Sequence, residues 1–132
     1  MFPMNLLLKI IISVLAAYLL GSILPAYFFA RAKGFDIRER GTGNPGIGNA
    51  ATTMGYGAAV QVAFFDILKA PLAMLLVNYL KLPSAFSFLC GFVVVLGHIA
   101  PFYLKFKGGK GAATTMGIIG FAVVLLLREN LN

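Results

Sequence analysis

The sequence predicts an all-α integral membrane protein with about four hydrophobic helices joined by glycine-rich loops. Of its 132 residues, 60% are hydrophobic and 11% are charged, whereas a soluble domain is about 45–50% apolar and about 25% charged. The mean hydropathy is +0.90. A chain this short could not bury so much apolar surface in one water-soluble core. These observations exclude an ordinary soluble enzyme, a disordered chain and a disulfide-rich secreted module.

Four apolar segments are expected to form a single membrane domain over residues 1–132, at about 5–30, 57–77, 85–104 and 112–127. A helix needs roughly 20 residues to span the hydrocarbon layer, so the first three segments are long enough to cross. The fourth is short, at roughly 24 Å of helix, and either crosses thinly or dips in and returns. The first segment is too long for the apolar part of a signal peptide, and we interpret it as a retained span.

The distribution of charge predicts the orientation of the chain. The net charge is +7, and the basic residues are concentrated in the loops 31–55 and 105–111. Basic loops stay on the cytoplasmic side, so both loops are expected to face the cytoplasm. The N-terminus then lies outside, as does the C-terminus if all four segments cross. Basic loops that meet anionic lipid explain this charge better than binding to nucleic acid.

The first basic loop contains a run of glycines and polar side chains typical of an anion site. Glycines let backbone N–H groups turn toward a bound anion, and arginines lie just upstream at Arg38 and Arg40. The alternative is a flexible loop at the membrane edge. The candidate residues of this run are Gly41, Thr42, Gly43, Asn44, Gly46 and Asn49.

The second basic loop opens the fourth apolar segment with Lys107, Gly108, Gly109 and Lys110. Helix N-termini attract anions, so a phosphate cradle is plausible here. The loop lacks the spacing of a Walker A motif, and a simple positively charged anchor is the alternative. Since both loops are expected on one face, a substrate with a phosphate head and an acyl tail would suit them.

Among the ionisable side chains within the apolar segments, Asp66, Lys69 and His98 are candidates for a site. Asp66 and Lys69 are three residues apart, so they share a helix face and can pair. Ionisable residues inside a membrane usually face the bundle interior, where this pair is either structural or part of a site. His98 precedes the second basic loop and is either a packing residue or a site residue.

In chain order, these motifs resemble the bacterial acyl-phosphate:glycerol-3-phosphate acyltransferases, the PlsY-type family. The resemblance covers residues 18–117 approximately. It rests on Gly21-Ser22-Ile23, Gly34-Phe35-Asp36-Ile37-Arg38, the run GTGNPGIGNA from Gly41, Asp66-Ile67-Leu68-Lys69, Gly97-His98 and FKGGKGAAT from Phe106.

The resemblance implies transfer of a fatty acyl group from acyl phosphate to the 1-hydroxyl of glycerol 3-phosphate, giving lysophosphatidic acid for phospholipid biosynthesis. It implies a multi-pass protein of the bacterial inner (plasma) membrane that uses no cofactor, metal or acyl-CoA. The expected partners are the two substrates and the lipid bilayer, with a homo-oligomer as a further expectation. The implied catalytic residues are Thr42, Asn44 and Lys110, the phosphate-binding ones Gly41, Gly43, Gly46, Asn49, Lys107, Gly108 and Gly109, and the supporting ones Arg38, His98, Asp66 and Lys69.

Some positions depart from the family pattern. Thr42 stands where the family has serine, Thr52 where it has arginine, and Leu127 where the C-terminal motif has histidine. These departures keep open a catalytically degenerate homologue that binds lipid phosphate or a partner. A small transporter is a weaker alternative, because the first apolar segment carries no acidic residue. If segment 112–127 crosses, the C-terminal residues 128–132 are stranded away from the cytoplasmic loops.

Overall fold

The computed structural model describes residues 4–131, and all regular structure in this range is helical, which confirms the predicted fold class. Three helices are long and apolar enough to cross a membrane, or four if the bent pair α1–α2 is one span. The elements are α1 (Leu6–Ser22), α2 (Pro25–Ala32), η1 (Ile37–Glu39), α3 (Ile47–Met54), α4 (Tyr56–Tyr79), α5 (Ser84–Ile99), η2 (Phe102–Leu104) and α6 (Ala112–Asn130).

The first apolar segment is broken, where the sequence predicted one helix over 5–30. Helix α1 ends at Ser22, α2 begins at Pro25, and their axes differ by 44°. Proline lacks a backbone N–H and disfavours helical geometry at the residue before it, and Leu24 is accordingly extended. The break leaves the carbonyls of Gly21 and Ile23 outside the helical hydrogen bonding, and both accept hydrogen bonds from a lysine described below.

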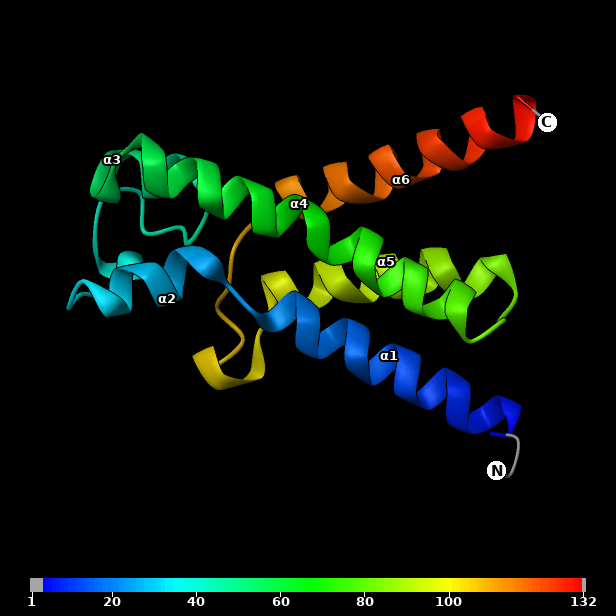
Figure 1. Cartoon of the computed structure of the whole chain (residues 1–132). Coiled ribbons are helices and arrows are strands. Elements are labelled where there is room, and N and C mark those ends of the chain that lie inside the picture. The colour runs from blue at the N-terminus through cyan, green and yellow to red at the C-terminus, as the bar shows by residue number, and fades with distance from the viewer. Residues whose placement is uncertain (1–3, 132) are drawn as a thin grey trace.

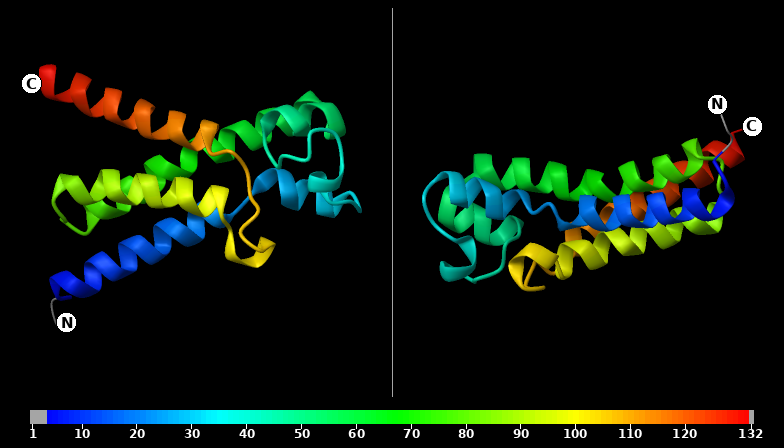
Figure 2. Two further views of the ribbon diagram at one scale, coloured as in Figure 1. Left: turned by 180° about the vertical axis from the view of Figure 1, so that it is seen from behind. Right: turned by 90° about the horizontal axis from the view of Figure 1, so that it is seen from below.

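The core of the bundle is formed by α1, α4 and α5, which lie side by side in all three ribbon views (Figures 1 and 2). Helices α1 and α5 approach closely through glycines, because a Cβ at Gly97 would overlap the backbone of Tyr18 and a Cβ at Gly21 would overlap that of Val94. Small residues at such contacts are typical of membrane helices, in which dispersion forces hold the helices together.

Helix α6 packs against α4 and α5, with Ile118 and Phe121 in the bundle core, and its C-terminal part diverges from the bundle (Figure 1). Both described chain ends lie at one end of the molecule, while α3 and the loop before it lie at the other (Figure 2). Because α6 runs as one continuous helix from Ala112 to Asn130, it carries the C-terminal residues away from the loops. Within the described range, the end of α6 thus lies at the opposite end of the molecule from α3 and the loop before it (Figure 2).

The loop predicted over 31–55 contains the helix α3, which sequence analysis missed. This short helix buries Ala50 together with Ala26 and Ala30 of α2, Ile37 of η1 and Val62 of α4. A helix of eight residues is unstable in isolation, so packing against α2 and α4 is what stabilises it. The small core fixes the glycine-rich loop against the end of the bundle.

Candidate active site

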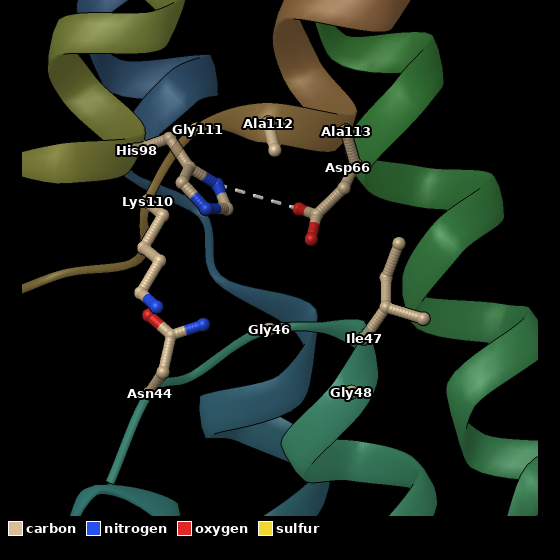
Figure 3. A pocket seen from close by; sticks show the side chains of 10 residues that line it. All are labelled: Asn44, Gly46, Ile47, Gly48, Asp66, His98, Lys110, Gly111, Ala112 and Ala113. Atoms are coloured by element: carbon tan, nitrogen blue, oxygen red, sulfur yellow. Dashed lines mark ion pairs between the residues drawn. The ribbon is translucent and has the colours of Figure 1, made fainter. Parts of the chain in front are cut away.

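The N-termini of two helices, α3 and α6, meet at one cavity of about 190 Å³. The first N–H groups of a helix have no intrahelical acceptor, and the helix dipole adds a partial positive charge there. Figure 3 shows the two helices starting on opposite sides of the cavity. A helix N-terminus is a natural anion site, and here two of them converge. The lining residues are Asn44, Gly46, Ile47, Gly48, Asp66, His98, Lys110, Gly111, Ala112 and Ala113.

Two side chains from separate loops point toward one another at this cavity (Figure 3): Asn44, from the loop before α3, and Lys110, from the loop before α6. Lys110 is exposed, and no acidic side chain in residues 4–131 forms an ion pair with it. Its ammonium group and the Asn44 amide are therefore available to an anion that enters between the two helix ends.

The wall of the cavity nearest the membrane-spanning helices contains a buried charge cluster. Lys69 Nζ lies 2.9 Å from Asp66 Oδ1 and 2.9 Å from His98 Nδ1, and His98 Nδ1 lies 3.5 Å from Asp66 Oδ1. All three side chains are at most 5% exposed. Because an ammonium group only donates, His98 accepts at Nδ1 and carries its proton on Nε2. Asp66 and His98 line the cavity, whereas Lys69 supports them from behind.

Lys69 also donates hydrogen bonds to the carbonyl groups that the α1–α2 break leaves without helical partners. Its Nζ donates to Gly21 O at 3.2 Å and to Ile23 O at 2.8 Å. An ionised side chain inside a membrane is costly unless it is paired and hydrogen-bonded. The broken first span thus provides half of the environment that allows a charged lysine next to the cavity.

The glycines of the second basic loop fold back onto the end of α5. Gly108 N donates to Ile99 O at 2.8 Å and Gly109 N donates to His98 O at 2.9 Å. A Cβ at Gly109 would overlap the His98 ring. The N–H groups of Gly108 and Gly109, which were predicted to bind phosphate, are thus hydrogen-bonded within the chain and hold the loop against the end of α5.

Asn49 organises the first glycine-rich loop from within. Its Nδ2 donates to Ile37 O at 3.0 Å and to Arg40 O at 2.9 Å, and its Oδ1 accepts from Thr42 N at 3.0 Å. The side chain is 2% exposed. Both amide protons are in use, so the structure favours a scaffold role for Asn49 in place of the predicted phosphate contact.

The structure brings only part of the predicted site together. Asn44, Gly46, Lys110, Asp66 and His98 line the cavity. Outside its lining lie Gly41, Thr42, Gly43, Asn49, Arg38, Lys107, Gly108 and Gly109. Thr42 is exposed, and its Oγ1 accepts a hydrogen bond of 3.4 Å from Asn44 N, so it contacts a cavity residue without lining the cavity. Four of these residues, Arg38, Gly43, Lys107 and Gly108, line a separate depression of about 310 Å³.

Sequence reasoning missed the cavity residues that contribute backbone. Ile47 and Gly48 begin α3, and Ala112 and Ala113 begin α6. Their side chains carry no polar group, so no residue type marks them. The usable signal was the glycine immediately before each helix, at Gly46 and Gly111.

An apolar groove of about 420 Å³ lies at the break between α1 and α2 and runs along α4. Lys69 is the only charged residue of its lining and also touches both Asp66 and His98. The groove and the polar cavity therefore lie on either side of one buried charge cluster. The groove is lined by Leu20, Ile23, Pro25, Phe28, Phe29, Phe65, Leu68, Lys69 and Leu72.

The family model for glycerol-3-phosphate acyltransferase matches residues 11–128 of the chain. The chain belongs to this family. The resemblance drawn from the motifs is thereby confirmed, as is the assignment to integral, multi-pass membrane proteins. A cytoplasmic position of the cavity stays a prediction.

Relatives and solved structures agree with this membership. The "Glycerol-3-phosphate acyltransferase 1" of Deinococcus radiodurans is 46% identical over 112 residues, which are 85% of this chain and 57% of that protein. The corresponding protein of Thermoanaerobacter sp. is 40% identical over 110 residues, 83% of this chain and 55% of that one. The crystal structure of the integral membrane acyltransferase PlsY in its glycerol 3-phosphate form has 35% identity and a TM-score of 0.78, covering 92% of this chain and 62% of that one.

The match extends to a second crystal structure of PlsY, in its lysophosphatidic acid form, with a TM-score of 0.76 and 35% identity over 92% of this chain and 61% of that one. The chain spans a little more than half the length of these two curated relatives.

Proposed function

We propose that the chain transfers a fatty acyl group from acyl phosphate to the 1-hydroxyl of glycerol 3-phosphate, giving lysophosphatidic acid and inorganic phosphate. The observation that carries this proposal is the convergence of two helix N-termini and Lys110 on one cavity. Two anionic substrates need such an unpaired positive surface. Membership of the glycerol-3-phosphate acyltransferase family supports the same reaction.

The electrostatics of the cavity suit acyl transfer. Negative charge develops on the acyl oxygen and on the departing phosphate, and fixed N–H dipoles aimed at such charge stabilise a transition state strongly. In this proposal the first N–H groups of α3 and α6 hold the phosphate groups, and Lys110 with Asn44 closes the cavity over them. Holding both substrates at one place also removes much of the entropic cost of the encounter.

The reaction balances as a direct transfer. The 1-hydroxyl oxygen of glycerol 3-phosphate attacks the acyl carbon, the new ester bond forms, and the bond from that carbon to the phosphate oxygen breaks. The hydroxyl proton passes to the departing phosphate, which is itself a base. Residues 4–131 contain no Ser-His-Asp arrangement at the cavity, and the proposal uses no acyl-enzyme intermediate and no cofactor.

The apolar groove at the α1–α2 break is our candidate for the acyl tail. It combines apolar lining with a position directly behind the Asp66–Lys69–His98 cluster. A chain in the groove would place its polar end near the cavity, which we expect on the cytoplasmic face of a bacterial inner membrane.

A catalytically degenerate homologue is the second candidate function. Thr52, where the family has arginine, turns its hydroxyl back onto Asn49 O at 3.1 Å and offers no cation to the cavity. Such a protein would bind lipid phosphate or a partner without turnover.

A turnover assay separates the two. Detergent-purified protein receives labelled glycerol 3-phosphate with palmitoyl phosphate and, in parallel, with palmitoyl-CoA. We expect lysophosphatidic acid from the acyl phosphate only, and loss of at least 100-fold in rate for Lys110→Gln, as for other oxyanion-stabilising groups. Binding of glycerol 3-phosphate without product supports the degenerate homologue. Folded protein with neither binding nor product contradicts both.

A further inference from the structure

A second pocket near the same end of the molecule is separate from the cavity between α3 and α6. It measures about 330 Å³ and is lined by Tyr27, Arg38, Tyr103, Leu104, Lys105 and Lys107. None of these residues lines the first cavity. We refer to Tyr27, Arg38, Tyr103, Lys105 and Lys107 as the basic pocket. Its polar side chains come from α2, from η1 and from η2 with the loop that follows it. Residues far apart in the sequence are therefore brought together by the fold.

The lining of the basic pocket has three cations and no acid. Arg38 directs Nε and Nη2 to Asp36, at 3.1 Å and 2.8 Å. Its Nη1 makes only a long hydrogen bond of 3.4 Å to Leu104 O. Lys105 and Lys107 form no ion pair with any residue in the described range 4–131. The uncompensated positive charge of the pocket is therefore that of Lys105 and Lys107, since Arg38 is paired with Asp36.

An unusual turn presents the two lysines. Lys105 and Phe106 have φ of 53° and 59°, a left-handed conformation that is uncommon for residues other than glycine. The turn is held by hydrogen bonds from Phe106 N to Pro101 O and from Lys107 N to Leu104 O, both 3.1 Å. It buries Leu104 and leaves both lysines exposed. Strained backbone of this kind persists only where its surroundings enforce it.

Aromatic side chains form the side of the pocket nearest the spans. The ring of Tyr103 lies 6.3 Å from that of Tyr27 and 5.9 Å from that of Phe28. The Tyr103 hydroxyl donates to Ser22 O at the end of α1, at 2.6 Å. Phe28 and Phe102 beside the pocket are about half exposed. Aromatic belts of this kind mark the level of lipid headgroups.

We propose that the basic pocket binds the phosphate of an anionic bilayer lipid, whose glycerol and first acyl carbons lie against Phe102. Cations alone would suit any phosphate, but exposed rings next to them favour a phosphate that is attached to acyl chains. The Tyr27 hydroxyl, which makes no hydrogen bond within residues 4–131, is free to donate to the headgroup. This inference goes beyond the acyl transfer and does not depend on it.

Native mass spectrometry of the detergent-purified chain tests the proposal. The protein is equilibrated with phosphatidylglycerol and phosphatidylcholine of matched acyl chains, and the ratio of the two bound lipids is measured. We expect the unaltered chain to bind one molecule of phosphatidylglycerol in preference to phosphatidylcholine. The ratio of the two bound lipids should fall about fivefold in Lys105→Gln, the factor expected for one basic residue at a membrane surface. Lys105→Arg should restore it. Circular dichroism confirms that each variant is folded.

The matched control is Lys33→Gln, which removes the same charge from an exposed lysine at the end of α2. An equal loss of preference in Lys33→Gln, or no preference in the unaltered chain, overturns the proposal. Displacement of phosphatidylglycerol by an equal concentration of inorganic phosphate also overturns it, because the pocket would then bind phosphate without requiring a lipid. Lys110→Gln should abolish turnover and keep the lipid preference, so failure of the two proposals can be told apart.

Discussion

Gly117 on α6 packs directly against the main-chain carbonyl of Ile67 on α4, at the point where Pro71 interrupts the hydrogen bonding of α4. Proline has no N–H to donate to the carbonyl four residues earlier, so the Ile67 oxygen is left without its helical partner. A glycine on the neighbouring helix can come close enough to cover it. This contact fixes the start of α6, and with it the N–H groups that α6 presents to the cavity.

Gly117→Leu should displace α6. A Cβ at this position would overlap the Ile67 carbonyl, and overpacking of this kind costs about 1–3 kcal/mol. We expect a lower midpoint of thermal unfolding in detergent and weaker binding of glycerol 3-phosphate by calorimetry. The control is Gly120→Leu, one turn further along α6, where a Cβ meets nothing within 4 Å. Unchanged binding in Gly117→Leu would show that the contact does not position the cavity.

Lys69→Met should destabilise the chain strongly. The substitution leaves Asp66, 2% exposed in its side chain, without its ammonium partner, and breaking a buried ion pair costs about 3–5 kcal/mol. The double variant Lys69→Met with Asp66→Asn should recover much of this loss, because it removes both charges. Equal unfolding midpoints for the single variant and the unaltered chain, measured by circular dichroism, would contradict the pairing.

Leu72→Trp should change the preference for acyl chain length. Leu72 lines the apolar groove, and a larger ring there shortens the space for a tail. We expect kcat/KM for palmitoyl phosphate to fall about tenfold, the lower end of the effect of one methylene group in an apolar pocket, with octanoyl phosphate unaffected. Leu75→Trp, an exposed position on the same helix outside the groove lining, is the control. A parallel fall for both chain lengths would place the tail elsewhere.

Asp36→Asn should flatten the acid side of the stability profile. Hydrogen bonds from the Arg38 side chain hold the pKa of Asp36 below its ordinary value of 3.8. A lowered pKa in the folded state stabilises the protein at pH above that ordinary value, and the contribution disappears as the pH falls through the folded-state pKa. Thermal midpoints measured from pH 7 to pH 3 should therefore fall more steeply in the unaltered chain than in Asp36→Asn. Glu39→Gln, an exposed neighbour, should keep the steep profile.

The sequence predicted the parts of the fold that depend on composition. Three of the four apolar segments correspond to α4, α5 and α6, because a run of apolar residues is sufficient to define a span. The bend before Pro25 and the helix α3 were missed. Both depend on neighbours distant in sequence: α3 is stabilised by α2 and α4, and the carbonyls at the bend by Lys69.

The sequence predicted the site residues that contribute polar side chains to the cavity. It did not predict the residues that contribute only backbone N–H groups. Lys110 and Asn44 were found by residue type. Gly108, Gly109 and Asn49 were expected to bind phosphate, but residue type does not reveal that the N–H groups of the two glycines are engaged by α5 and the Asn49 side-chain amide by the loop itself. The partner of a backbone N–H is a property of the fold. For the same reason Ala112 and Ala113 could not be found in advance.

The break in the first span gives Lys69 ligands of an unusual kind. The carbonyls of Gly21 and Ile23 form the negative end of the α1 dipole, and they can neither gain a proton nor move away. Membrane transporters use interrupted helices in the same way to coordinate cations. An ammonium group solvated by main chain does not depend on a single carboxylate. The ammonium group of Lys69 therefore keeps two hydrogen-bond acceptors that are independent of Asp66.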